Sequence, residues 1–130
     1  MSAGYLLDTH IAILATAAPE RLSSSIRSAV KRGPNVLSVI TYWEVVLKSA
    51  KGKLDVGDPL AWWRMALEDL GATSLPLRPD HVAEVYSLAP THQDPFDRAL
   101  IAQAIVEGLT LATADEAMRS YAGERLRILR

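Results

Sequence analysis

The chain has 130 residues, of which 49% are apolar and 22% charged, and its formal net charge is −1. This balance is typical of one globular domain and argues against disorder, and the lack of net positive charge argues against nucleic-acid binding by bulk charge. The absence of cysteine excludes disulfides, cysteine-bound zinc, iron–sulfur clusters and thiol catalysis.

The start of the chain has no basic segment followed by a long apolar run. We therefore expect no signal peptide, no membrane span and a cytoplasmic location. Short apolar runs, bounded by turn or helix-start residues, predict strands over residues 4–7, 36–38, 73–77, 109–113 and 126–129. Pro76 disfavours a central position in a sheet for the third of these strands.

Helix-start and helix-stop residues divide the segments between the strands. Asp-Pro pairs at 58–59 and 94–95 are typical helix starts, with the acid as cap and proline in the first turn. We expect helices over about 11–18, 22–32, 40–51, 58–70, 79–88, 94–108 and 115–121. Short buried strands that alternate with helices predict a single three-layer α/β/α domain over residues 1–130, with a central parallel sheet of four to five strands.

Acidic residues follow two of the predicted strands. Asp8 comes directly after the first strand, and Asp115 lies two residues beyond Thr113. Ligands of parallel α/β sheets bind beyond the carboxyl ends of the strands, so both acids are predicted on one rim of the sheet. Each acid taken alone is equally consistent with a helix cap.

A third acid falls on an apolar helix face. The helix after the second strand has an apolar stripe made of Ile40, Trp43 and Leu47. Glu44 lies on this stripe, and a carboxylate that faces the interior is costly unless a cation or hydrogen-bond donors meet it. The alternative is a structural salt bridge to Lys48, one helical turn further on.

The fourth acid, Asp97, lies in the first turn of the helix that begins at Asp94. The helix dipole favours an acid there without any further function. Asp97 also shares a face with Leu100 and Ile101, which predicts that it lies over the sheet. We interpret Asp94 first as the cap of this helix.

Clustered carboxylates repel one another, so several remain ionised at close range only if a cation neutralises them. The chain has no cysteine, and we interpret His10 as a surface or capping residue, so the predicted ligands are essentially all oxygen. Such a set favours Mg²⁺ or Mn²⁺, which suits metal-assisted hydrolysis of a phosphodiester.

Basic and aromatic residues give weaker signals. Three lysines follow Glu44 and are candidate phosphate contacts: Lys48, Lys51 and Lys53. The alternative for them is a solvated helix face. We interpret the three tryptophans as core residues. For Trp62, which lies off the apolar stripe of its helix, an interface role is the alternative.

Five segments together carry a family resemblance, from Tyr-Leu-Leu-Asp-Thr-His at the start to Leu-Thr-Leu-Ala-Thr-Ala-Asp at the end. They span residues 5–10, 37–45, 51–54, 94–104 and 109–115. In order and spacing they resemble the motifs of PIN-domain ribonucleases, and most closely those of the VapC toxins of toxin–antitoxin pairs. By this resemblance the four acids of the family correspond to Asp8, Glu44, Asp97 and Asp115.

The resemblance also assigns Thr113 a supporting role through hydrogen bonding. The segment before Glu44 departs from the family, in which small residues and a serine are common. Val39, Ile40 and a bulky Tyr42 stand there, while Thr41 keeps a hydroxyl. These changes affect the surroundings of the site and leave the four acids intact.

What the resemblance implies is a PIN fold and a Mg²⁺- or Mn²⁺-dependent endoribonuclease, with tRNA or rRNA as the expected substrate. It further implies a homodimer held inactive by a cognate antitoxin that places a basic side chain in the acidic site. DNA contact is expected only through the antitoxin. In this framework Lys48, Lys51 and Arg98 are candidate RNA contacts, and Asp94 and Thr41 support the site.

Two other functions fit parts of the sequence. A phosphoacceptor receiver domain has a similar length and an acidic Mg²⁺ pocket. Its pattern, however, has an acid pair after the first strand and a lysine near the last strand. Here Asp8 is a single acid, and Gly123-Glu124-Arg125 contains no lysine. A PIN-like scaffold that binds antitoxin or RNA without cleavage is the other alternative, and calorimetric titration with metal separates it from a nuclease.

Overall fold

The computed structural model describes residues 4–130, so the predicted domain boundary at residue 1 lies outside the described part. The strands in this part are β1 (Tyr5–Leu7), β2 (Asn35–Ser38), β3 (Ala72–Leu75), β4 (Thr110–Ala112) and β5 (Ile128–Leu129). They form a five-stranded sheet in the order β3-β2-β1-β4-β5, and all neighbouring strands are parallel. The predicted parallel sheet is confirmed, with β3 at its edge.

The helices begin and end close to the predicted residues. They are α1 (Thr9–Ala17), α2 (Ser24–Arg32), α3 (Val39–Ala50), α4 (Pro59–Asp69), α5 (Pro79–Tyr86), α6 (Pro95–Glu107) and α7 (Glu116–Arg119), with a short 3₁₀ helix, η1 (Pro19–Arg21), after α1. Asp58 caps α4 by accepting a hydrogen bond from the Ala61 N–H at 3.3 Å. None of the helices within residues 4–130 is both long and apolar enough to cross a membrane.

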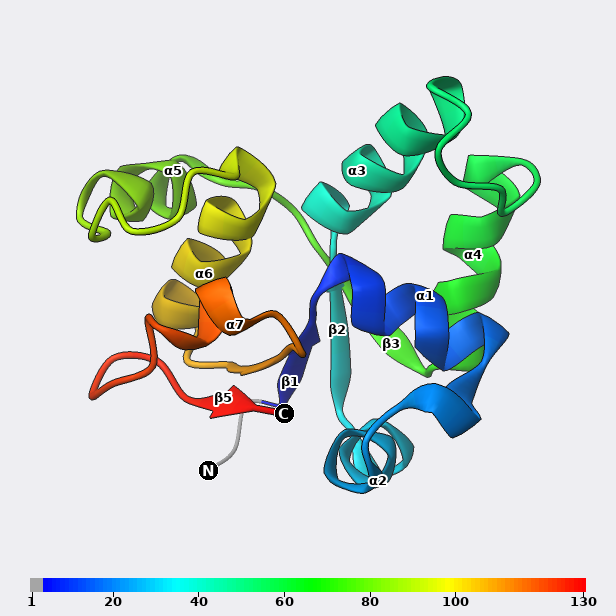
Figure 1. The fold of residues 1–130 in the computed structure, drawn as a ribbon, viewed down its shortest axis with the longest axis horizontal. Helices are drawn as coiled ribbons and strands as arrows, with labels where there is room; N and C mark the ends of the chain where they lie inside the picture. Colours follow the sequence, from blue (N-terminus) through cyan, green and yellow to red (C-terminus); the bar gives the residue numbers. More distant parts are fainter. Residues whose placement is uncertain (1–3) are drawn as a thin grey trace.

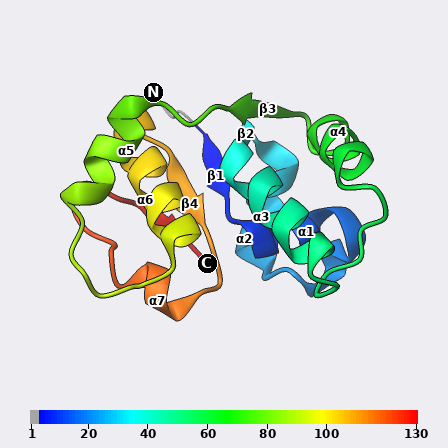
Figure 2. The same cartoon turned by 90° about the horizontal axis from the view of Figure 1, so that it is seen from above.

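Each face of the sheet carries its own apolar core, because alternate residues of a strand point to opposite faces. Leu7 and Leu37 belong to the core that α1, α2 and α4 cover, whereas Leu6 and Leu111 belong to the core that α6 covers. Figure 2 shows these layers from above, with α5 and α6 on one side of the strands and α1 and α4 on the other. The predicted three-layer arrangement is confirmed.

Helices begin where the central strands end. β1 is followed at once by α1, β2 by α3, and β4 by the loop that leads to α7 (Figure 1). Ile40 in the first turn of α3 belongs to one core and Val45 to the other, so α3 passes over the edge of the sheet. The first turns of these helices therefore surround the rim on which the sequence analysis placed the acids.

The three tryptophans differ in burial, although all three were predicted to be core residues. Trp62 and Trp63 are buried, and the Nε1 of Trp62 donates to the Thr16 hydroxyl at 3.3 Å. The core interpretation is therefore confirmed for Trp62, because α4 packs against both α1 and α3 and buries two adjacent faces. For Trp43 the core interpretation is wrong. It is 53% exposed and packs edge-on against Phe96 of α6, at the margin of the core rather than inside it.

Candidate active site

A cavity of about 700 Å³ opens at the carboxyl edge of the sheet. Its walls come from α1, η1, α3, the loop after α3, the start of α6 and the loop after β4. The acidic part of the lining consists of Asp8, Glu44, Asp94, Asp97 and Asp115. The structure thus brings the four predicted acids, which lie on separate elements of the chain, to one cavity.

Asp8 is the residue between β1 and α1 and is 5% exposed. Its Oδ1 accepts a hydrogen bond from the Ile11 N–H at 2.8 Å, and its Oδ2 accepts one from the Thr113 hydroxyl. Burial, the largest influence, raises the pKa of this carboxyl above its ordinary value. Asp8 is therefore a helix cap, as the alternative interpretation held, and also part of the cavity wall.

Thr113 connects two of the acids. Its hydroxyl donates to Asp8 and accepts a hydrogen bond from the Asp115 backbone N–H at 3.0 Å. Asp115 is exposed, and its Oδ1 caps α7 by accepting from the Ala117 N–H at 2.8 Å. The buried hydroxyl of Thr113 thus fixes both the Asp8 carboxylate and the turn that carries Asp115.

Glu44 is buried, as its position on the apolar face of α3 predicts. Its Oε2 lies 2.9 Å from the Nζ of Lys48, so the salt bridge of the alternative interpretation is present. The hydrogen bond with Glu44 is the main cause that raises the pKa of Lys48. The other oxygen, Oε1, is buried and has no hydrogen-bond partner among the described residues. A buried carboxylate oxygen without a partner is costly, and a cation bound beside it would satisfy it.

Asp97 is partly buried at the start of α6, and its Oδ2 lies 2.7 Å from the Nε2 of His92. Burial is the largest of the influences that raise the pKa of Asp97 to about 6, and the charges of Asp94 and Glu44 act in the same direction. His92 was not among the predicted site residues. Its position five residues before Asp97 was the available signal, but a loop residue follows no helical or strand periodicity.

Asp94 and Thr41 form hydrogen bonds near the acids of the cavity. The Oδ1 of Asp94 accepts hydrogen bonds from the backbone N–H groups of Phe96 at 2.8 Å and Asp97 at 3.2 Å, which is the predicted cap. The buried Thr41 hydroxyl lies 3.2 Å from that of Thr9 and joins α3 to the start of α1 beside Asp8. Both contacts hold the backbone that presents the acids.

The other side of the cavity is basic and apolar. It is lined by His10, Ile13, Leu14, Arg21, Lys48, Lys53 and Leu54. Lys48 is engaged by Glu44, whereas Arg21 and Lys53 form no ion pair within residues 4–130. Lys51 is exposed and lines a neighbouring hollow of about 160 Å³ rather than this cavity.

Arg98, a predicted RNA contact, does not line the cavity. Its guanidinium donates to the backbone carbonyls of Ala89 at 2.9 Å, His92 at 3.2 Å and Val85 at 3.2 Å. These bonds hold the segment between α5 and α6 against the first turns of α6. Because the donors of Arg98 satisfy carbonyls within the chain, it acts as a structural residue there.

The donor set suits a hard divalent cation. Four carboxylates face one cavity, two of them have raised pKa values, and one oxygen of Glu44 is buried without a partner. A dication would supply that partner and offset the repulsion between the acids. One ligand atom from each of His92, Asp97 and Asp115 lies within 4.8 Å of the others, a spacing within reach of a single ion.

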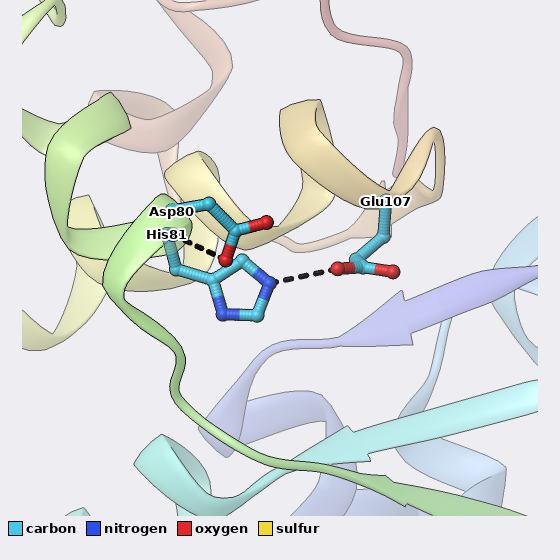
Figure 3. A group of neighbouring side chains, drawn as sticks. All are labelled: Asp80, His81 and Glu107. Carbon is cyan, nitrogen blue, oxygen red and sulfur yellow. Dashed lines mark hydrogen bonds and ion pairs between the residues drawn. The ribbon is translucent and has the colours of Figure 1, made fainter.

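A second group of similar residues lies between α5 and α6, away from the cavity. In Figure 3 the His81 ring of α5 points toward Glu107 of α6, and its Nε2 lies 2.8 Å from the Glu107 carboxylate. The His81 Nδ1 accepts a hydrogen bond from the Arg78 N–H at 3.0 Å, and the Arg78 guanidinium pairs with both Asp80 and Glu107. We call Arg78, Asp80, His81 and Glu107 the α5–α6 clamp. Because Arg78 already balances the negative charge of Asp80 and Glu107, we interpret this group as structural.

Comparisons with known proteins agree with this architecture. Ribonuclease VapC22 of Mycobacterium tuberculosis is 28% identical to the chain over 118 residues, which cover 89% of this chain and 90% of that protein. The solved DNA-bound VapBC of Salmonella typhimurium has a similar fold, with a TM-score of 0.69 and 18% identity over 99% of this chain and 98% of that one.

VapBC2 of Rickettsia felis, solved bound to a DNA fragment from its promoter, gives a TM-score of 0.68 at 15% identity and covers 96% of both chains. At these identities the solved structures show the shared fold. The family model of the PIN domain matches residues 5–124, nearly the whole chain. The chain therefore belongs to the PIN domain family.

Proposed function

We propose that this protein is a metal-dependent endoribonuclease toxin that hydrolyses RNA phosphodiester bonds and is neutralised by a cognate antitoxin. The observation that carries the proposal is the assembly of Asp8, Glu44, Asp97 and Asp115 in one cavity, with Oε1 of Glu44 buried and unpaired. The name of the relative Ribonuclease VapC22 supports the ribonuclease class. Membership of the PIN family removes the receiver-domain alternative.

Asp8, Glu44, Asp97 and Asp115 would hold Mg²⁺ or Mn²⁺ in this site. Such an ion, when bound, activates water and stabilises negative charge on the attacked phosphate and the leaving oxygen. The chain supplies the geometry. Thr113 orients the Asp8 carboxylate and the Asp115 backbone, while Lys48 holds one oxygen of Glu44 and the other has no hydrogen-bond partner in the described part of the chain.

The basic and apolar side of the cavity is the proposed RNA track. Arg21 and Lys53 have no ion-pair partner in the described part of the chain, so their charges are available to phosphates next to the cleaved one. Leu54 and Ile13 offer an apolar surface against which a base of single-stranded RNA can pack. Lys51, in the adjacent hollow, extends the same track.

The partners follow from the same proposal. Both solved structures named above are VapBC assemblies with DNA, which supports a cognate antitoxin and DNA contact through that antitoxin. An arginine of the antitoxin would match the acidic cavity because it supplies the positive charge that a metal otherwise supplies. A homodimer and a cytoplasmic location remain parts of the proposal.

The experiment measures cleavage of a mixed tRNA and rRNA panel with Mg²⁺, Mn²⁺ or EDTA. We expect cleavage with either metal and none with EDTA. In Asp8→Asn the activity should fall by at least about 100-fold, because a ligand is lost while asparagine still caps α1. The matched control is Asp69→Asn, an exposed acid outside the cavity that should leave activity unchanged.

Cleavage that survives EDTA, or that is equal in Asp8→Asn and the wild type, would refute the metal-dependent mechanism. A protein that binds the metal and RNA but cleaves nothing on the panel would favour the non-cleaving scaffold.

A further inference from the structure

His92 lies on the loop before α6, and both of its backbone groups are held in place. Its N–H donates to the Tyr121 hydroxyl at 3.0 Å, and its carbonyl accepts from the Arg98 guanidinium at 3.2 Å. Tyr121 in turn donates to the Ala89 carbonyl at 2.7 Å. The imidazole is therefore carried by an ordered piece of backbone, which is the preorganisation that a ligand residue requires.

The ring nitrogen Nε2 lies next to two of the acids that line the cavity. It lies 2.7 Å from Oδ2 of Asp97, and one carboxylate oxygen of Asp115 completes a set of three ligand atoms within 4.8 Å. Asp97 and Asp115 have no lysine or arginine within ion-pairing distance in the described chain. In the α5–α6 clamp, by contrast, the guanidinium of Arg78 pairs with both acids and supplies the positive charge.

We propose that His92 is a direct ligand, through Nε2, of the divalent ion that Asp97 and Asp115 hold, and that it makes the site favour Mn²⁺ over Mg²⁺. The inference rests on the proposed function and deepens it by naming a nitrogen ligand beside the four acids. Imidazole suits first-row transition ions, whereas Mg²⁺ is held by oxygen and keeps much of its water. An all-oxygen site would give no such preference for manganese through a protein side chain.

The test uses Mn²⁺ alone, added to the full-length, metal-free protein, and electron spin-echo spectroscopy of the bound ion. Nuclear modulation from a coordinated imidazole nitrogen is expected in the wild type. It should be lost in His92→Gln and retained in His10→Gln, the matched control, because His10 lines the same cavity but is exposed on α1. His81 is not expected to supply the signal, because Arg78 already pairs with both acids beside it.

Calorimetry adds a second readout. The Mn²⁺ affinity should decrease by about 10- to 100-fold in His92→Gln, and the Mg²⁺ affinity should decrease less, so the preference for manganese shrinks. If His92→Gln does not fold, His10→Gln labelled with ¹⁵N-histidine decides, because the label then changes the modulation only if His92 or His81 binds the ion, and Arg78 already pairs with the acids beside His81.

The possible results distinguish the role of His92 from the existence of the metal site. Wild-type protein that binds Mn²⁺ without nitrogen modulation would overturn the role of His92 and leave the acidic metal site intact. Wild-type protein that binds no divalent ion would overturn both. Modulation that persists in His92→Gln and disappears in His10→Gln would assign the nitrogen to His10 and refute the proposal.

Discussion

Two groups of histidine and carboxylate side chains in this molecule differ in how their charge is balanced. In the α5–α6 clamp, Arg78 pairs with both acids and His81 uses both ring nitrogens. At the carboxyl edge of the sheet, Asp97 has only His92 as an ion-pair partner, and Asp115 has none in residues 4–130. The same residue types thus build a complete structural contact in one place and an incomplete one in the other. The incomplete one indicates where a ligand belongs.

The largest expected effect on folding comes from the complete group. His81→Ala removes a fully buried ring and leaves the Arg78 N–H and the Glu107 carboxylate without their partner. We expect the free energy of unfolding to decrease by about 2–4 kcal/mol, measured by urea denaturation. The control is His92→Ala in the metal-free protein, which should cost less than about 1 kcal/mol because the ring is partly exposed. Equal losses would show that the two groups do not differ as described.

The incomplete group should respond to metal instead. Mn²⁺ at one hundred times its dissociation constant should stabilise the wild type by about 2.7 kcal/mol, because it binds only the folded state. Asp97→Asn should lose most of this stabilisation. Asp80→Asn, which changes an acid of the α5–α6 clamp, should keep it. Denaturation curves with and without Mn²⁺ measure the difference, and a gain that is equal in both variants would contradict the assignment.

A smaller effect concerns pH in the absence of metal. The pKa of Asp97 in the folded protein is raised to about 6, above its ordinary value of 3.8, so the folded state binds this proton more tightly than the unfolded state. The stabilisation that Asp97 contributes is therefore fully present below its pKa in the unfolded state. It is lost as the pH rises through its pKa in the folded state. After allowance for solvent screening, the loss should be about 1–2 kcal/mol.

Urea denaturation between pH 4 and pH 7, a window set by the two pKa values of Asp97, measures this dependence. Asp97→Asn should reduce the slope, and the matched Asp69→Asn should leave it unchanged. A wild-type protein that becomes more stable through Asp97 as the pH rises would reverse the sign and refute the burial argument.

The smallest effects are expected on the RNA track. Arg21→Gln and Lys53→Gln should each weaken binding of single-stranded RNA by about 2- to 5-fold, since one exposed charge contact contributes about 0.2–1 kcal/mol. Arg64→Gln, an exposed arginine of α4 outside the cavity, is the matched control. Binding measured in the Asp8→Asn background avoids cleavage. If Arg64→Gln weakens RNA binding as much as Arg21→Gln and Lys53→Gln do, the RNA track does not lie on this side of the cavity.

Most of the fold could be predicted because its local signals are strong and agree with one another. Asp58 and Asp94 each precede a proline and cap a helix as predicted, and Gly108 ends α6. The burial of Glu44 also followed from helical periodicity, and its salt bridge with Lys48 was foreseen as the alternative. These features depend on residues within one or two turns of each other, which sequence patterns record.

Three features could not be predicted from helix or strand periodicity. Arg98 satisfies carbonyls before α6, and no sequence pattern indicates that use of a guanidinium. Trp43 lies on the apolar stripe of α3, yet its burial depends on how far α6 covers that helix. His92 reaches Asp97 from a loop, where periodicity gives no direction. Such details are fixed by tertiary packing.

The most direct test of the central claim is calorimetric titration of the metal-free protein with Mn²⁺. We expect saturable binding to the wild type and to Asp69→Asn. In Asp8→Asn, whose helix cap is preserved, the affinity should be weaker by at least about tenfold. Absence of binding to the wild type, or equal affinity in Asp8→Asn, would contradict the claim that these acids form a site for a divalent ion.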